Sequence, residues 1–193
     1  VNSYRARINP QLYFYYVELA NFTKPQADPV QLRSWAYVRE QQAAVLELPG
    51  TGVATAIDVG EADDIHPTDK KTVGNRLAGM ALNDIYGKKS LCRSPQYASH
   101  KISGDKVIIT FDNADGLRER AGKEKSFAIR GADGNWVWAD KVKISGNAIE
   151  VSAQAIKDPA AVRYAWASNP ETALENKEGL PLLPFRTDKD SVE

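Results

Sequence analysis

Apolar residues follow two different patterns along the chain, and the pattern changes near residue 88. The first part contains two continuous apolar runs rich in aromatic, β-branched and small residues, Leu12–Leu19 and Thr51–Ile57. Runs of this length and composition are typical of strands that are buried on both faces of a parallel sheet. We therefore predict two central strands in the first part of the chain.

A helical pattern follows the first run. Asp28 and Pro29 predict a helix that starts at Pro29 and ends near Leu46, because aspartate caps helices well and proline fits the first helical position. Leu32 is expected on the inner side of this helix and Arg33 on the outer side. We interpret Arg39 as mainly structural, as a tie between the helix and an acid near the functional loop.

A second helical pattern follows the second run. Thr68 or Asp69 is expected to cap this helix, and Gly87 is expected to end it. The order of strand, helix, strand and helix over residues 12–86 predicts a right-handed βαβα unit with parallel strands.

Beyond Gly87 the apolar runs become short and alternating, and turn residues such as Asp133-Gly134 separate them. Residues 88–104 have a loop-like composition, and we place the domain boundary there, which predicts domains of residues 1–88 and 89–193. The second domain is expected to be an antiparallel β-sandwich with strands near residues 106–111, 126–130, 136–138, 141–144, 148–151 and 162–166. The proline-rich segment Gly179–Asp188 is expected to be an extended strap that packs back over the first domain.

Charge and composition exclude several classes of function. Lysine plus arginine and aspartate plus glutamate number 25 each, so the chain has no basic field that would attract nucleic acid. No apolar run reaches the roughly 18 residues needed to cross a bilayer, so we expect no membrane insertion. Cys92 is the single cysteine, and we interpret it as a structural thiol. No cofactor is expected.

Candidate chemistry is concentrated in the loop between the second strand and the second helix, residues 58–67. His66 lies there among four acids, Asp58, Glu61, Asp63 and Asp64. The loop is at the carboxyl end of a strand, where open α/β sheets place their chemistry. A histidine that acts as a general base needs a carboxylate on its second ring nitrogen. By spacing alone, a solvated acidic loop with an incidental histidine is an equally good interpretation.

Four segments resemble one family. DDIHPTDKKTVGNRLAGMAL at residues 63–82, FYYVELANF at 14–22, VRYAW at 162–166 and GLPLLPFRTD at 179–188 are similar to the sialate O-acetylesterase family, which is grouped with carbohydrate esterase family six. These enzymes resemble SGNH hydrolases, whose fifth motif is D-x-x-H. The resemblance implies a flavodoxin-like parallel sheet, of which this chain forms the C-terminal part, followed by the β-sandwich.

The resemblance also implies a catalytic role for His66. Its partner acid is Asp63 by the D-x-x-H spacing, with Asp64 and Asp58 as alternatives. The implied activity is hydrolysis of acetyl esters on a sugar such as sialic acid or xylan, in a secreted or periplasmic enzyme.

The serine nucleophile is the missing part of this interpretation. Ser3, Ser34, Ser90, Ser94 and Ser99 have none of the glycine-rich context in which the family carries its serine. Our hypothesis is that an N-terminal part of the same esterase, possibly a separate chain, supplies the serine to His66 and its acid.

Two other functions remain open from the sequence. Trp136, Trp138 and Trp166 suit either sugar stacking or core packing, so a non-catalytic carbohydrate-binding or scaffold module is the alternative to an enzyme. A metal site is a weaker idea, because no second histidine or cysteine lies near His66. His100 is expected to be an ordinary loop histidine.

Overall fold

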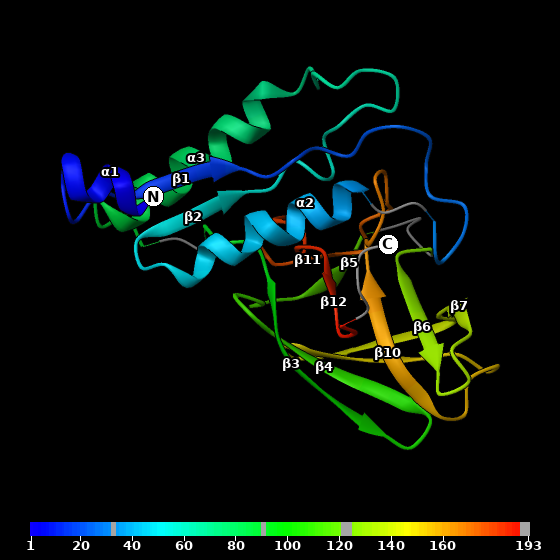
Figure 1. Cartoon of the computed structure of the whole chain (residues 1–193). Helices are drawn as coiled ribbons and strands as arrows, with labels where there is room; N and C mark the ends of the chain where they lie inside the picture. The colour runs from blue at the N-terminus through cyan, green and yellow to red at the C-terminus, as the bar shows by residue number, and fades with distance from the viewer. Residues whose placement is uncertain (32–33, 90–91, 121–124, 190–193) are drawn as a thin grey trace.

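The protein is described here by a computed structural model that covers residues 1–31, 34–89, 92–120 and 125–189. Figure 1 shows a mixed α/β fold, with helices gathered on one side and antiparallel strands on the other. A short helix, α1 (Asn2–Arg7), precedes the first strand.

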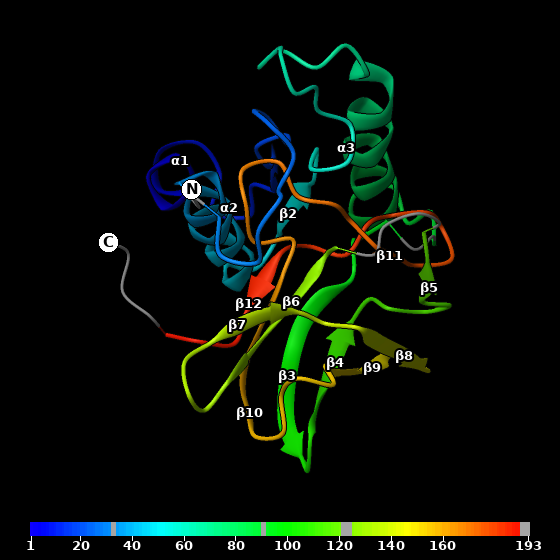
Figure 2. The same cartoon turned by 90° about the vertical axis from the view of Figure 1, so that its right-hand side faces the viewer.

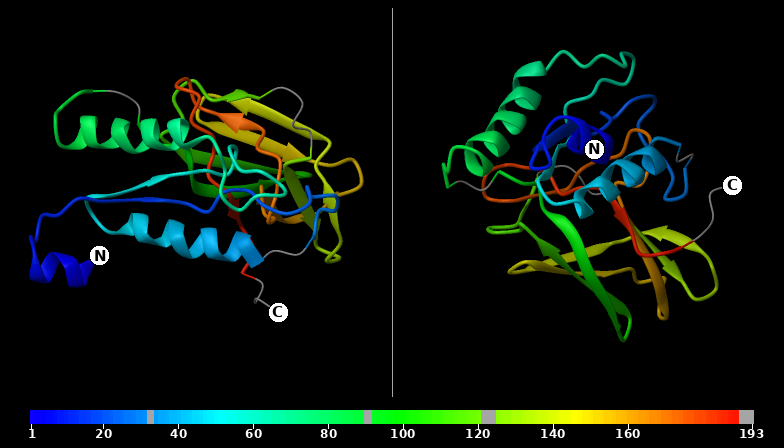
Figure 3. Two further views of the ribbon diagram at one scale, coloured as in Figure 1. Left: turned by 90° about the horizontal axis from the view of Figure 1, so that it is seen from above. Right: turned by 60° about the vertical axis from the view of Figure 1, so that its left-hand side comes forward.

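The first part is built on two parallel strands. β1 (Phe14–Val17) pairs with β2 (Thr51–Ala54) from Phe14 opposite Thr51 to Val17 opposite Ala54, which confirms the predicted parallel pairing. α2 (Ser34–Ala43) and the 3-10 helix η1 (Ala44–Glu47) connect the two strands, and α3 (Lys70–Asp84) follows β2. Figure 3 shows α2 and α3 on opposite sides of this strand pair.

Close packing of α3 on β2 depends on a glycine. A Cβ atom at Gly52 would lie only 2.6 Å from Sδ of Met80, a fully buried residue of α3. Every residue of β2 is buried, whereas β1 is half-buried to exposed. The strand that leads into the candidate loop is therefore the more tightly held of the two.

The second part consists mainly of two four-stranded antiparallel sheets, which Figure 2 shows in another orientation. The first sheet has the order β3 (Gln96–Ser103), β4 (Lys106–Asp112), β9 (Ala148–Ser152) and β8 (Lys141–Ser145). The second has the order β12 (Phe185–Arg186), β10 (Pro159–Tyr164), β6 (Phe127–Gly131) and β7 (Trp136–Trp138). β5 (Arg118–Glu119) and β11 (Leu174–Glu175) form a separate pair.

Both large sheets contribute to one hydrophobic core, as expected of a β-sandwich-like arrangement. Ile109 and Val151 enter it from the first sheet, and Val162 and Tyr164 enter it from the second. Ile57 belongs to the same core, although it comes from the segment that follows β2. The start of the candidate loop is thus anchored in the β part of the molecule.

The helix predicted from Pro29 begins later than expected. Pro29 lies in a turn, and α2 begins at Ser34, while Leu32 and Arg33 lie outside the described residues. Local hydrogen bonds explain the turn, because Oε1 of Gln31 accepts from the backbone N–H of Ala27 and the backbone N–H of Gln31 donates to the carbonyl of Asp28. These bonds compete with the first turn of a helix.

Two segments that were expected to be irregular contain strands. β3 occupies the second half of the predicted loop 88–104, and its residues are largely exposed, so it shows no apolar alternation in the sequence. β12 lies in the proline-rich tail as a two-residue edge strand that pairs with β10. Edge strands are the positions where polar residues and prolines are tolerated. The division into residues 1–88 and 89–193 stays a prediction.

Candidate functional site

The candidate loop leaves the carboxyl end of β2 and returns at the start of α3, as Figure 1 shows. Oδ1 of Asp69 accepts a hydrogen bond from the backbone N–H of Thr72 at 3.0 Å, so Asp69, one of the two predicted capping residues, caps α3. The loop therefore has a rigid element at each end.

His66 lies at the exposed tip of this loop, where 85% of its side chain is accessible to solvent. Nδ1 of the ring lies 3.5 Å from Oδ1 of Asp64, which is longer than a good hydrogen bond. The same carboxylate oxygen accepts the backbone N–H of His66 at 2.7 Å. Asp64 thus holds the backbone of His66 and lies beside its ring.

The other two candidate acids have different surroundings. Asp63 is exposed, and within the described ranges no hydrogen bond or ion pair links its carboxylate to His66. Asp58 is buried, and both of its oxygens bind Arg76. Among the three predicted acids, only Asp64 lies next to the ring in this structure.

Asp58 is part of a buried ion-pair cluster. Arg120, from the β part, also reaches Oδ2 of Asp58 at 3.1 Å. Burial favours the neutral acid, but hydrogen bonding and attraction from Arg76 and Arg120 outweigh burial and hold the pKa of Asp58 below its usual value. The Asp58 carboxylate is therefore ionised and already fully paired at neutral pH.

Backbone contacts brace the lower part of the loop. Oδ1 of Asn21 accepts from the backbone N–H of Gly60 at 2.7 Å, and the backbone N–H of Thr23 donates to the carbonyl of Ala62 at 3.1 Å. A Cβ atom at Gly60 would lie 2.0 Å from the carbonyl oxygen of Asn21. Only glycine allows this close approach between the loop and the segment that follows β1.

A buried acid that the sequence analysis did not single out lies at the carboxyl ends of both parallel strands. Glu18 is 1% exposed, and its Oε2 accepts the hydroxyl of Thr55 at 2.5 Å. Burial raises the pKa of Glu18 to about 7, although the Thr55 hydrogen bond and the charge of Arg39 both lower it. The available sequence signal was one acid inside a run of apolar and aromatic residues.

The sequence interpretation paired Arg39 with an acid, but no acid of the described residues forms a hydrogen bond or ion pair with it. Its fully buried guanidinium donates to four backbone carbonyls, those of Leu19, Ala20, Ala167 and Ser168, at 2.7 to 2.9 Å. Burial lowers the pKa of Arg39 to about 10, and the charge of Glu18 opposes that change. Arg39 joins the end of β1 to the segment after β10.

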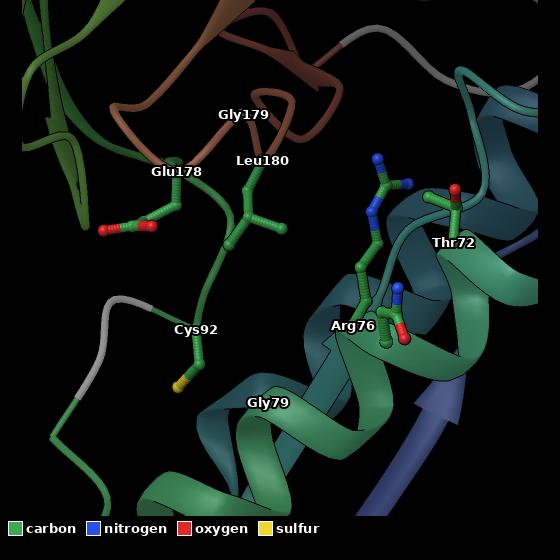
Figure 4. A pocket seen from close by; sticks show the side chains of 8 residues that line it. Thr72, Arg76, Gly79, Cys92, Glu178, Gly179 and Leu180 are labelled. Carbon is green, nitrogen blue, oxygen red and sulfur yellow. The ribbon is translucent and has the colours of Figure 1, made fainter.

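A cavity of about 340 Å³ lies between α3 and the turn at residues 178–180, as Figure 4 shows. Its lining includes Thr72 and Arg76 from α3, with Cys92 and Leu180 across from them. Burial raises the pKa of the Cys92 thiol, which fits the predicted structural role and disfavours a thiolate nucleophile. His66 does not line this cavity.

No serine hydroxyl hydrogen-bonds to the His66 ring within the described part of the chain, and Ser34 and Ser90 have side chains outside that description. Ser99 binds Thr110 on the neighbouring strand instead, and Ser94 is buried. His100 is an exposed residue of β3, where its Nδ1 lies 2.7 Å from the hydroxyl of Tyr97.

Two other features are absent from the described ranges. No group of three histidine, cysteine, aspartate or glutamate side chains there is placed to hold a metal ion. No helix in that part of the protein has the length and apolar character needed to cross a bilayer.

Comparison with solved structures gives a specific likeness. The chain is similar to the crystal structure of a carbohydrate acetylesterase from Xanthomonas citri, with a TM-score of 0.89 and 39% sequence identity. The match covers 98% of this chain but 44% of that protein, so this chain spans less than half the length of its structural relative. No protein-family model and no curated protein sequence matches the chain.

Proposed function

We propose that this chain is part of a carbohydrate O-acetyl esterase and that it contributes the catalytic histidine, His66. The observation that carries the proposal is the similarity over 98% of this chain to a carbohydrate acetylesterase. The position of His66 supports it, since an exposed imidazole beside an aspartate, at the carboxyl end of a parallel strand, suits a general base.

In the proposed reaction, His66 takes a proton from a serine hydroxyl as that oxygen attacks the acetyl carbonyl carbon. The bond between the acetyl carbonyl carbon and the sugar oxygen then breaks, and His66 returns the proton to the departing sugar oxygen. Water repeats the two steps on the acetyl-serine and releases acetate. Asp63 or Asp64 would orient the ring and stabilise its protonated form.

We further propose that the serine comes from an N-terminal part of the same esterase, either fused to this chain or separate from it. Two observations support this assignment. The relative is more than twice as long as the matched region, and β1–β2 is a sheet of only two strands within the described residues. Further parallel strands would complete a flavodoxin-like SGNH sheet and cover its free edges.

The test uses the assembled protein, meaning this chain together with the part that carries the serine. His66→Ala should lower kcat for p-nitrophenyl acetate by about a hundredfold or more, the usual contribution of a general base. His100→Ala is the matched control and should leave kcat unchanged. A loss smaller than tenfold for His66→Ala, with circular dichroism unchanged, would contradict the proposal.

The acetylated sugar is to be identified with the same assembled protein. Release of acetate from 9-O-acetyl sialic acid and from acetylated xylan distinguishes the two substrate classes that the family resemblance suggests. We propose a secreted or periplasmic location, where such substrates occur.

A non-catalytic carbohydrate-binding module has weaker support. Trp166 is 3% exposed, and the guanidinium carbon of Arg163 lies 4.3 Å from the ring centre of Trp136. Trp138 is half-buried on β7 and is the best of the three for stacking on a sugar. Glycan capture without hydrolysis, lost in Trp138→Ala, would favour this alternative.

A further inference from the structure

The tip of the candidate loop has little packing of its own. Asp63, Asp64, Ile65 and His66 are all exposed, and 49% of Ile65 is accessible although its side chain is apolar. A general base must nevertheless be held in one place, because misplacement by about 1 Å can reduce a rate a hundredfold. The orientation of His66 therefore depends on how the two ends of the tip are fixed.

One carboxylate joins those two ends. Oε1 of Glu61 accepts the backbone N–H of Thr68 at 2.9 Å and the hydroxyl of Thr68 at 2.7 Å. These two bonds lower the pKa of Glu61, so its carboxylate is ionised at neutral pH and is a strong acceptor. Residues 61–68 thereby form a closed loop with His66 inside it.

Each side of this closure is held by further contacts. On one side, Ala62 next to Glu61 is bound by the backbone of Thr23, and Gly60 is bound by Asn21. On the other side, Thr68 precedes Asp69, the cap of α3. A displacement of Thr68 relative to Glu61 would therefore move His66 relative to the sheet.

We propose that Glu61 is a positioning residue for His66 and that it acts through Thr68. The proposal rests on the esterase function proposed above. Glu61 does not touch the His66 ring in this assignment. It holds the loop in one conformation, so that the imidazole is already in position to take the proton of the serine.

Variants of both partners test this clamp in the assembled protein. Glu61→Ala and Thr68→Val should each lower kcat about ten- to a hundredfold with KM changed less than twofold, because positioning acts on the reacting geometry. Glu61→Asp should also lose activity, since its shorter side chain withdraws the acceptor. Glu61→Gln and Thr68→Ser keep the hydrogen-bonding atoms and should stay within threefold of the wild type.

A matched control exists in another turn. Asp133, between β6 and β7, also accepts one backbone N–H and one side-chain N–H, both from Asn135. Asp133→Ala likewise removes one backbone and one side-chain hydrogen bond to a carboxylate, and it should leave kcat unchanged. If Asp133→Ala lowered kcat as much as Glu61→Ala, the loss would be general and the positioning role would be wrong.

Hydrogen exchange tests the clamp without any reaction. In Glu61→Ala the backbone amides of His66 and Thr68 should exchange at least tenfold faster, while the amides of α3 beyond its first turn stay unchanged. Unchanged exchange at Thr68 would overturn the clamp, whatever the activity. Faster exchange with unchanged kcat, in a protein that His66→Ala inactivates, would overturn only the positioning role. Full activity of His66→Ala would instead overturn the proposed function.

Discussion

Arg76 binds the carboxylate of Asp58 through both of its terminal nitrogens, with Nη1 at 2.7 Å from Oδ1 and Nη2 at 2.9 Å from Oδ2. Nη1 also donates to the carbonyl of Thr55, and Arg120 adds a third nitrogen to Asp58. One buried carboxylate thus joins the end of β2, helix α3 and the β part of the molecule. This geometry makes Asp58 a structural acid and leaves Asp63 and Asp64 as the candidates for a partner of His66.

Asp58→Asn should lower the free energy of unfolding by about 3 kcal/mol at pH 7, because it leaves the buried Arg76 without its counter-charge and removes one of the two acids that pair with the half-buried Arg120. Urea denaturation measures this loss. The folded-state pKa of Asp58 is lowered, so its stabilising effect is present above the usual carboxyl pKa and is lost as pH falls through the lowered value. The difference between wild type and variant should therefore shrink toward low pH.

Asp115→Asn is the control for this substitution. Asp115 is 76% exposed and lies 3.9 Å from Lys177, so its loss should cost no more than about 0.5 kcal/mol. If both substitutions lowered the free energy of unfolding equally, burial would not explain the contribution of Asp58 to stability.

Arg39→Lys should destabilise the protein by at least about 2 kcal/mol although the charge is kept. A lysine ammonium cannot reach four carbonyls placed on two separate segments, so buried acceptors are left unpaired. Arg118→Lys, at a side chain that is 55% exposed, should change stability by less than about 0.5 kcal/mol. Thermal unfolding of both variants checks this, and a stable Arg39→Lys protein would contradict the clamp assigned to Arg39.

Glu18→Gln should become relatively more stable than the wild type as pH rises. The pKa of Glu18 is raised from 4.5 to about 7, so its contribution is fully present below 4.5 and is lost as pH rises through 7. Glutamine keeps the acceptor for Thr55 and carries no charge. Between pH 4.5 and pH 8, the free energy of unfolding of the variant should rise by up to roughly 3 kcal/mol relative to that of the wild type. This value follows from the pKa shift, because each pKa unit corresponds to about 1.4 kcal/mol.

The expected change in stability comes from the carboxyl group of Glu18, because the two titratable groups that face it, Arg39 and Tyr16, do not change charge over this pH range. Arg39 stays charged over this range, and burial, followed by the charge of Glu18, raises the pKa of Tyr16 to about 12. Glu47 is exposed on η1, so Glu47→Gln is the control for the change from carboxylate to amide and should alter stability at pH 7 by no more than about 0.5 kcal/mol. A pH-independent difference for Glu18→Gln would refute the raised pKa.

Asp63→Asn should lower kcat of the assembled protein more than Asp64→Asn does. The carboxylate of Asp64 is occupied by the backbone N–H of His66, whereas Asp63 is exposed and free to turn toward the ring. We expect a loss of about a hundredfold or more for Asp63→Asn and of about tenfold for Asp64→Asn, since a triad acid sets the tautomer of its histidine. The pH profile of kcat in each variant checks the assignment, and the reverse order would make Asp64 the triad acid.

The sequence alone was sufficient for the elements whose signals are local. A cap of α3 at Thr68 or Asp69, the parallel pair β1–β2 and the alternating strand β4 all follow from capping residues, continuous apolar runs or alternation, and the structure selects Asp69 as the cap. The closeness of His66 to Asp64 was also predictable, because the two residues are close together in the chain.

Only the tertiary structure decided which polar groups are paired with each other. Asp58 was taken as a possible partner of His66, but its carboxylate is paired with Arg76 and with Arg120, which comes from a distant part of the chain. Arg39 was expected to bind an acid, and it binds carbonyls at positions more than a hundred residues away. Such pairings depend on the packing of segments that are distant in the sequence, because this packing removes water from a polar group and determines which partner is near it. A local sequence pattern therefore cannot predict them.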